Sequence, residues 1–302
     1  MSRLIKQGET KHVSRLIKAT KDFSGQINDY EISPTSQGVW GSKAKITCGS
    51  TIIKSDDLDV EFDVSFDDDM EANEAEITIY NLSDNTINKL TRGAYITVEA
   101  GFDNDTGVIF RGYIDKPTTT YEGADKVTTL RCLDNISKRT LEEITYTSGT
   151  KASYILKDLL NRTGTPIAVF NMRRDWTYED EQKVDGDLME CIKRYSQVCG
   201  VSTFVKYGKI YSRHIKQGDN IGFTLSEDTG LIGSPTAYEE ELTAEDFKET
   251  ITGWECQMLL QHRISAGVII NLKSLAAKGQ YRVRSGRHSY SNGECITTAK
   301  LM

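Results

Sequence analysis

The sequence predicts a mainly β fold with an α+β insert, in which two similar antiparallel β-barrels flank a small α/β domain. Apolar and polar residues alternate along many short runs, which is typical of strands with one buried and one wet face. Gly, Asn and Asp recur between these runs, where antiparallel turns need them. Near residue 150 the apolar spacing becomes helical. We therefore divide the chain into 1–42, a basic arm and loop; 43–146, the first barrel; 147–216, the inserted α/β domain; and 217–302, the second barrel.

Composition and charge exclude several classes of protein. The chain has 302 residues, 38% of them hydrophobic, which is enough for packed cores. Its net charge of −7 argues against specific nucleic-acid binding, because that affinity comes from Lys and Arg on phosphates. No apolar run approaches the roughly 20 residues that span a membrane. The N-terminal sequence MSRLIKQGETK lacks the apolar centre of a secretory signal, so we expect folding in a reducing cytoplasm.

The sequence offers no motif for catalysis or metal binding. The six cysteines contain no Cys-x-x-Cys pair, and we expect them to be small buried apolar residues. The four histidines, His12, His214, His262 and His288, stand apart from one another, and no nucleophile or phosphate-loop signature occurs. We predict a protein without enzymatic activity, metal or cofactor.

The N-terminal segment is strongly basic. Its first 21 residues hold one acid, Glu9, against six cations: Arg3, Lys6, Lys11, Arg15, Lys18 and Lys21. The sequence Ser-Arg-Leu-Ile-Lys occurs twice, at 2–6 and 14–18. Two interpretations remain open here, a docking arm for an acidic partner and a solvated basic tail.

An acidic strand follows in the first barrel. We expect strands over 43–53 and 57–66, and the second alternates apolar residues with four carboxylates: Asp57, Asp59, Glu61 and Asp63. Like charges on one face repel, so this face should meet water or a positive partner. If the face lines a tube, its carboxylates would repel DNA phosphates and keep passage non-adhesive.

Residues 74–116 carry the clearest strand pattern. Three alternating runs are separated by Asn81-Leu82-Ser83-Asp84, by Gly93, and by the hairpin loop 103–107. Either Ser83 or Asp84 can cap one short helical turn that ends before Gly93. This arrangement predicts antiparallel strands joined by one small helix.

The order of residues in this stretch resembles the first barrel of baseplate hub proteins. These belong to the late-control protein D family of contractile phages, phage-tail-like bacteriocins and type VI secretion spikes. The matching residues are Tyr80, Asn81, Leu82, Ser83, Gly93, Ala100, Gly101, Phe102, Phe110, Gly112 and Ile114. The sequence GLIGSP at 230–235, with Gly233 and Pro235, is also similar to the family. The resemblance implies two tail-tube-like barrels around an α/β insert.

Helical spacing marks the inserted domain. Ile155, Leu156, Leu159 and Leu160 form an apolar stripe that Thr150 can cap and Gly164 can end. A second helix is expected over about 187–198, followed by a hairpin around Gly208. These elements predict a compact α/β module.

The C-terminal strands repeat the pattern of the opening barrel. We match Gly93 with Gly267, Gly107 with Gly279, and Tyr-Asn-Leu at 80–82 with Met-Leu-Leu at 258–260. The alternative is that all hairpin barrels share such spacing. A duplicated barrel would let three subunits present six similar modules.

These observations lead to a structural hypothesis for function. The resemblance implies a baseplate hub: a homotrimer forming a pseudo-six-fold ring around a central channel, joining the tail tube protein ring to the spike protein. It would lie in the baseplate of a virion or tail particle, assembled in the bacterial host cytoplasm, with the tape measure protein or other baseplate proteins as further partners. The alternatives are a tail-tip hub of a long non-contractile tail, and a cell-wall-binding or wall-degrading tail protein that uses Trp176 and Tyr178.

Overall fold

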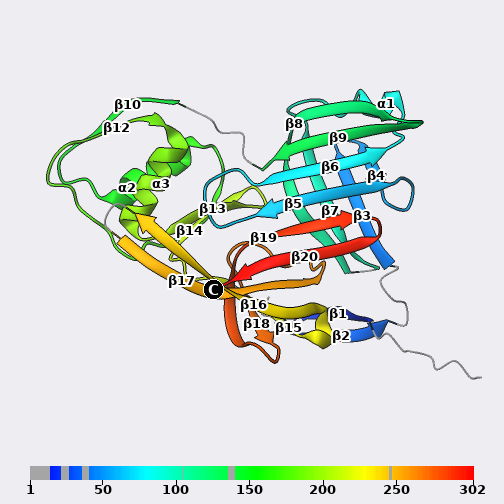
Figure 1. Cartoon of the computed structure of the whole chain (residues 1–302). Helices are drawn as coiled ribbons and strands as arrows, with labels where there is room; N and C mark the ends of the chain where they lie inside the picture. The colour runs from blue at the N-terminus through cyan, green and yellow to red at the C-terminus, as the bar shows by residue number, and fades with distance from the viewer. Residues whose placement is uncertain (1–13, 22–26, 36–40, 104, 135–139, 245–246) are drawn as a thin grey trace, which may run out of the picture.

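The computed structural model describes residues 14–21, 27–35, 41–103, 105–134, 140–244 and 247–302 (Figure 1). Their strands pair almost entirely antiparallel, which confirms the mainly β fold with an α+β insert. Buried residues form three hydrophobic clusters, one in each half of the β structure and one under two helices.

The first β unit is a curved sheet with one small helix. Its strands pair in the order β5-β6-β9-β8-β7-β3-β4. Their bounds are β3 (Ser42–Cys48), β4 (Thr51–Lys54), β5 (Val60–Phe66), β6 (Glu74–Tyr80), β7 (Tyr95–Phe102), β8 (Asp105–Glu122) and β9 (Asp125–Leu133), with α1 (Asp84–Ile87) between β6 and β7. Alternate residues of β5 and β6 are buried, as the sequence pattern predicts.

Two local predictions in this unit need correction. The single strand expected over 43–53 is the hairpin β3–β4, because Gly49 (φ 57°) turns the chain. The acidic strand begins at Val60, so Asp57 and Asp59 lie in the preceding turn and loop. Of the two expected caps, Ser83 accepts the hydrogen bond from the Thr86 amide.

The inserted part packs two helices on short strands. Its elements are β10 (Thr140–Tyr146), α2 (Ala152–Arg162), β11 (Ile167–Phe170), β12 (Gln182–Asp187), α3 (Leu188–Cys199), β13 (Ser202–Lys206) and β14 (Lys209–Arg213). Asp187 caps α3, and Gly200 ends it in the left-handed region. The cap expected at Thr150 is wrong, because Lys151 occupies the N-cap and the Thr150 hydroxyl donates to the Thr147 carbonyl.

Strand β10 favours a different limit for the first barrel. The first barrel expected over residues 43–146 includes β10, yet β10 pairs with β12 of the insert. Tyr146 at its end packs in the cluster of the two helices. This pairing favours ending the first β unit before β10.

The second β unit contains β15 (Asp219–Leu225), the short 3-10 helix η2 (Glu227–Thr229), β16 (Leu231–Ala244), β17 (Phe247–Leu259), β18 (Val268–Lys273), β19 (Lys278–Ser291) and β20 (Glu294–Leu301). The strands pair in the order β16-β17-β20-β19-β18-β15, and only β15 joins its neighbour in parallel. Figure 1 shows this unit below the first.

The segment expected as an arm and loop contains a hairpin. Strands β1 (Ser14–Lys21) and β2 (Ile27–Thr35) pair antiparallel, and β2 lies beside β15 (Figure 1). Arg15, Lys18 and Lys21 belong to β1, whereas Arg3, Lys6 and Lys11 lie outside the described residues.

Packing of the first core gives a direct test of this fold. Ile77 is fully buried in β6, and its replacement by alanine should lower the free energy of unfolding by about 2–4 kcal/mol. Chemical denaturation measures this change. The control is Ile52→Ala on β4, where the side chain is 58% exposed and the loss should be under about 1 kcal/mol. Equal losses for both variants would contradict the assigned core.

Candidate assembly interface

One strand pair joins the two β units into a continuous sheet. The second half of β19 pairs antiparallel with β5, from Gly286 opposite Phe66 to Tyr290 opposite Phe62. Figure 1 shows β19 lying beside β5 between the two units. We call this pairing the internal joint.

Side chains reinforce the internal joint on both faces. On the core side, Phe62 stacks on Tyr290 with ring centroids 5.5 Å apart. On the other face, Arg287 pairs with Asp63, and the Ser291 hydroxyl donates to Glu61 at 2.8 Å. The joint therefore combines backbone pairing, aromatic packing and charge.

A buried histidine fills the centre of the joint. His288 lies 4.9 Å from the Phe66 ring, and its nitrogens contact the Thr297 hydroxyl (2.8 Å) and the Ile264 carbonyl (3.1 Å). Burial lowers the pKa of His288 to about 3. The imidazole is therefore neutral near pH 7 and acts as a packing and hydrogen-bonding group.

A buried ion cluster holds the corner where the joint meets the insert. Asp68, just after β5, accepts from Arg282 at 2.5 Å and lies 3.5 Å from Arg284. Its carbonyl accepts from the Ser202 hydroxyl of the insert at 2.6 Å. Asp68 and Arg282 expose only 7% and 3% of their side chains, so each neutralises a charge that water barely reaches.

A second ion pair anchors the insert to the second β unit. Arg213 of β14 contacts both carboxylate oxygens of Asp219, at 2.8 and 3.0 Å, and donates to the Gly267 carbonyl. Burial lowers the pKa of nearby Lys206 to about 8, although Asp219 opposes the shift. Together the two clusters fix the insert against both β units.

The second β unit repeats the first strand by strand. The order β5-β6-β9-β8-β7-β3 reappears as β16-β17-β20-β19-β18-β15. Each long hairpin carries a register irregularity at the same step, at Asp115 in β8 and at Arg284 in β19. The units differ in one pairing, since β3 runs antiparallel to β7 while β15 runs parallel to β18.

Two glycines occupy equivalent corners of the repeat. The Gly93 amide donates to the Ile114 carbonyl at 2.7 Å, and the Gly267 amide donates to the Val283 carbonyl at 2.9 Å. Both glycines have a positive φ, 82° and 76°. This register agrees with the match of Gly93 and Gly267 in the sequence.

The other sequence matches are shifted. Gly279 lies opposite Leu272, which places it at the position of Phe110 and not of Gly107. The Asn81 amide donates to the Lys126 carbonyl as the Leu260 amide donates to the Cys295 carbonyl. Asn81 therefore corresponds to Leu260, one residue later than in our match of the tripeptides. Glycine spacing misplaced Gly279 because the hairpin of β7 and β8 is longer than the hairpin of β18 and β19.

The remaining family-pattern residues have local structural roles. Asn81 has a positive φ of 58° and accepts from the Lys126 amide, and Leu82 is buried. A Cβ at Gly101 or Gly112 would lie 2.1 or 2.3 Å from a backbone carbonyl oxygen, which demands glycine. Gly107 lies against His262 of the second unit; Gly233 (φ 68°) and Pro235 lie where the β16 register is irregular.

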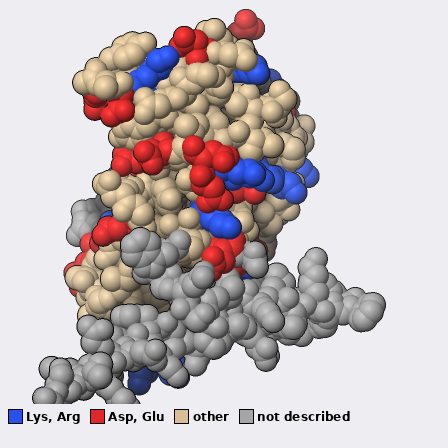
Figure 2. All heavy atoms as spheres, turned by 90° about the vertical axis from the view of Figure 1, so that its right-hand side faces the viewer, with Lys and Arg blue, Asp and Glu red and all other residues tan. Residues whose placement is uncertain are grey.

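The expected acidic strip is partly neutralised. Asp57 and Asp59 are exposed outside β5, while Glu61 and Asp63 face partners on β19. Asp63 lies opposite Glu76, which in turn lies opposite Arg131. Figure 2 likewise shows acidic and basic side chains interspersed on the face it presents. Whether these residues line a channel stays a prediction.

Among the described residues, the two strand edges that correspond to those of the internal joint have no neighbouring strand. Strand β8 pairs with β7 only as far as Tyr113, and its residues from Lys116 to Glu122 are exposed, with β9 on one side. In the described residues, β16 pairs only with β17. The corresponding edges of β19 and β5 are joined to each other.

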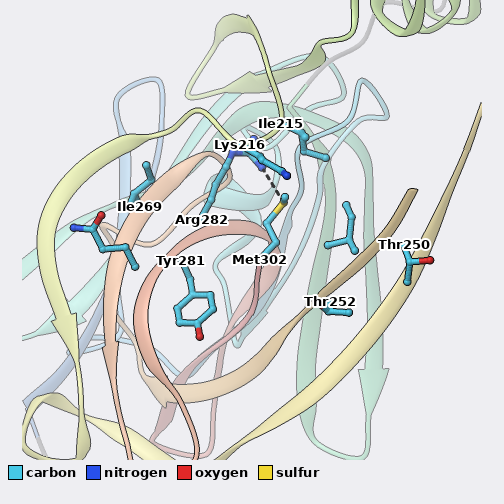
Figure 3. A pocket seen from close by; sticks show the side chains of 10 residues that line it. Ile215, Lys216, Thr250, Thr252, Ile269, Tyr281, Arg282 and Met302 are labelled. Atoms are coloured by element: carbon cyan, nitrogen blue, oxygen red, sulfur yellow. Dashed lines mark hydrogen bonds between the residues drawn. The ribbon is translucent and has the colours of Figure 1, made fainter. Parts of the chain in front are cut away.

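A cavity of about 410 Å³ lies between the second unit and the loop after β14 (Figure 3). Lys216 and Arg282 line it together with Thr252, Tyr281 and Met302. The Arg282 guanidinium is already engaged by Asp68, the Gln217 carbonyl and the Met302 sulfur.

The described residues show no cluster of His, Cys, Asp or Glu that could hold a metal ion. All six cysteines are free and buried. Within the described parts, no helix has the length and apolar character needed to span a membrane. Of the two aromatics considered for sugar stacking, Trp176 is 62% exposed, while Tyr178 packs edge-on against Tyr195.

Three solved structures share this fold. A 43 kDa tail protein of prophage MuSo2 from Shewanella oneidensis has a TM-score of 0.60 at 8% identity, over 86% of this chain and 97% of its own. A tail protein from Neisseria meningitidis MC58 has a TM-score of 0.61 at 9% identity, over 87% and 96%. No protein-family model and no curated protein matches the sequence.

The third structure is the E. coli c3393 protein, a component of the type VI secretion system described as similar to the T4 bacteriophage tail proteins gp27 and gp5. Its TM-score is 0.58 at 10% identity, over 85% of this chain and 76% of its own. The chain therefore has the fold of phage tail proteins and of this secretion-system component.

Loss of one buried charge should destabilise the contact of the internal joint with the insert. Asp68→Asn leaves Arg282 without its counter-charge and should lower the free energy of unfolding by about 3 kcal/mol. Denaturant titration measures the loss. The matched control, Glu143→Gln, removes the partner of Lys183 in a pair more than half exposed and should cost under about 1 kcal/mol. Equal losses of unfolding free energy in the two variants would show that the Asp68–Arg282 pair is not buried as described.

The neutral state of His288 gives stability a defined pH dependence. Its pKa is about 3 in the folded chain and near 6.5 when unfolded, so only the unfolded chain takes up the proton between these values. This contribution is complete above pH 6.5 and is lost as pH falls toward 3, by up to about 1.4 kcal/mol per pH unit.

Other groups titrate in the same range, so the measurement compares wild type with His288→Gln. The difference in unfolding free energy should shrink steadily from pH 6.5 downward. A difference that stays constant with pH would show that His288 is not buried as a neutral ring.

Proposed function

We propose that this protein is a structural baseplate hub of a phage or phage-like contractile tail. Three copies form a ring with pseudo-six-fold symmetry around a central channel. The ring joins the hexameric tail tube above to the trimeric spike below. This proposal goes beyond the fold itself, and one observation carries it: the same strand order occurs twice and is joined by one internal joint.

The internal joint supports a ring because it is a head-to-tail contact. It connects β19 of the second unit to β5 of the first, which are different edges of two similar modules. A contact between unlike patches, repeated with a constant rotation, closes a ring or extends a filament. Two units per chain let a trimer offer six similar surfaces to a six-fold neighbour and three identical chains to a three-fold one.

The described chemistry supports a structural role. The buried ionisable groups pair with one another or fill the core, as His288 and the Asp68–Arg282 pair do. The solved tail proteins that share the fold are consistent with a place in a tail particle. We propose no hydrolytic activity, and an assay on peptidoglycan tests this point: hydrolysis abolished by a single carboxylate substitution would overturn it.

The ring is tested by the mass of the purified full chain and by electron microscopy. Three chains of 33.9 kDa should give a particle of about 100 kDa with a hole at its centre. The hole should align with the tube channel when tail tube protein is added. A chain that stays monomeric at every concentration, or a particle without a central passage, would defeat the proposal.

A further inference from the structure

We infer that adjacent copies of this chain join through β8 of one copy and β16 of the next, in the register of the internal joint. The inference rests on the proposed ring and identifies its contact. The partner is a second copy of this chain, and the contact is an antiparallel strand ladder.

The strand repeat singles out these two edges. The internal joint uses β19 and β5, whose equivalents in the repeated order are β8 and β16. In the part of the chain that the structure describes, neither β8 beyond Tyr113 nor β16 has a strand paired to its outer side. A ladder between them would continue the sheet from one copy into the next, in the same way that the internal joint connects the two units of one chain. Strand β4 is also an edge strand of the first unit, but it lies outside the repeated strand order and has no counterpart in the internal joint.

Strand β8 is exposed along the stretch where its counterpart β19 pairs with β5. Its residues from Lys116 to Glu122 are all exposed, and Tyr121 reaches 72%. The equivalent residues of β19 are mostly half-buried or buried because β5 covers their edge. A free strand edge of this length is a hazard for aggregation unless a partner covers it.

The register follows from the two hairpin turns. Ser291 pairs with Glu294 across its turn, as Glu122 pairs with Asp125, so His288 corresponds to Thr119. Val64 of β5 pairs with Ala75 of β6, and Ala237 of β16 pairs with Trp254 of β17. Ala75 and Trp254 occupy equivalent positions in the repeat, so Val64 corresponds to Ala237. His288 lies opposite Val64 in the internal joint, so Thr119 should lie opposite Ala237 of the next copy.

Neighbouring pairs in this register are chemically compatible. Thr120 falls opposite Thr236 and Thr118 opposite Tyr238, and both kinds of pair suit a sheet. Two steps further, Lys116 falls opposite Glu240, whose carboxylate also pairs with Arg284 of its own chain at 2.9 Å. The irregularity of β16 before Thr236 ends the matching stretch.

Pro117 restricts what can add to this edge. Proline has no amide hydrogen, so the β8 edge offers one donor fewer than an ordinary strand. Its equivalent, Gly286, pairs with Phe66 in the internal joint. The missing donor makes the edge a poor template for random strands, while the correct partner supplies matching side chains as well.

Engineered disulfides test the register. Thr119→Cys combined with Ala237→Cys places two thiols across one rung, where Cα atoms lie about 4.5–5.5 Å apart, within reach of a disulfide. Mild oxidation should give covalent dimers and a covalent trimer on a non-reducing gel. The native cysteines are all buried, so the unchanged chain should give none.

The matched control combines Thr119→Cys with Ile232→Cys, which lies on the same strand but about 16 Å along it. It should remain monomeric on the gel. A ring of the expected mass in which Thr119 links to Ile232, or to neither site, overturns the register while the proposed hub stands. A chain that forms no ring and no cross-link overturns both.

Hydrogen exchange of the unmodified chain gives an independent measurement. On assembly, amide protection should rise at 118–121 and 236–240. Protection that appears instead at Thr51–Lys54 of β4 would overturn the inference, since that edge would then be the covered one.

Discussion

The pairing of β19 with β5 is the constraint on which the rest of the structure depends. It turns two separate β units into one sheet, and it fixes their relative orientation through backbone hydrogen bonds that cannot slip without turning core residues outward. His288 shows the consequence, because its ring is buried only while β19 keeps this register against Val64.

The buried ions add directional specificity to that pairing. Asp68 leaves β5 at the end of the joint and is held by Arg282 and Arg284 of β19, while its carbonyl accepts from Ser202 of the insert. A pair of this kind contributes little net stability compared with apolar packing, yet breaking it is costly. It therefore disfavours other arrangements of the three parts more than it strengthens the correct one.

A repeated unit that is joined head to tail within one chain suggests how several chains assemble. The internal joint shows that one unit's edge accepts the other's, and the two unused edges are of the same kind. The two joints would differ in chemistry: aromatic stacking and the Arg287–Asp63 pair act inside the chain, whereas threonines and one Lys–Glu pair would act between chains. The internal joint forms within one chain, whereas the second joint would need two chains to meet.

The sequence by itself determined the local elements, because their causes are local. Alternation predicted β5 and β6, an apolar stripe predicted α2, and the match of Gly93 with Gly267 pointed to the repeat. Only the tertiary structure decided the pairing of β10 with β12, the shift of Gly279 to the position of Phe110, and the charges that Glu61 and Asp63 face. These depend on contacts between residues far apart in the chain, which the spacing of residues along one strand does not encode.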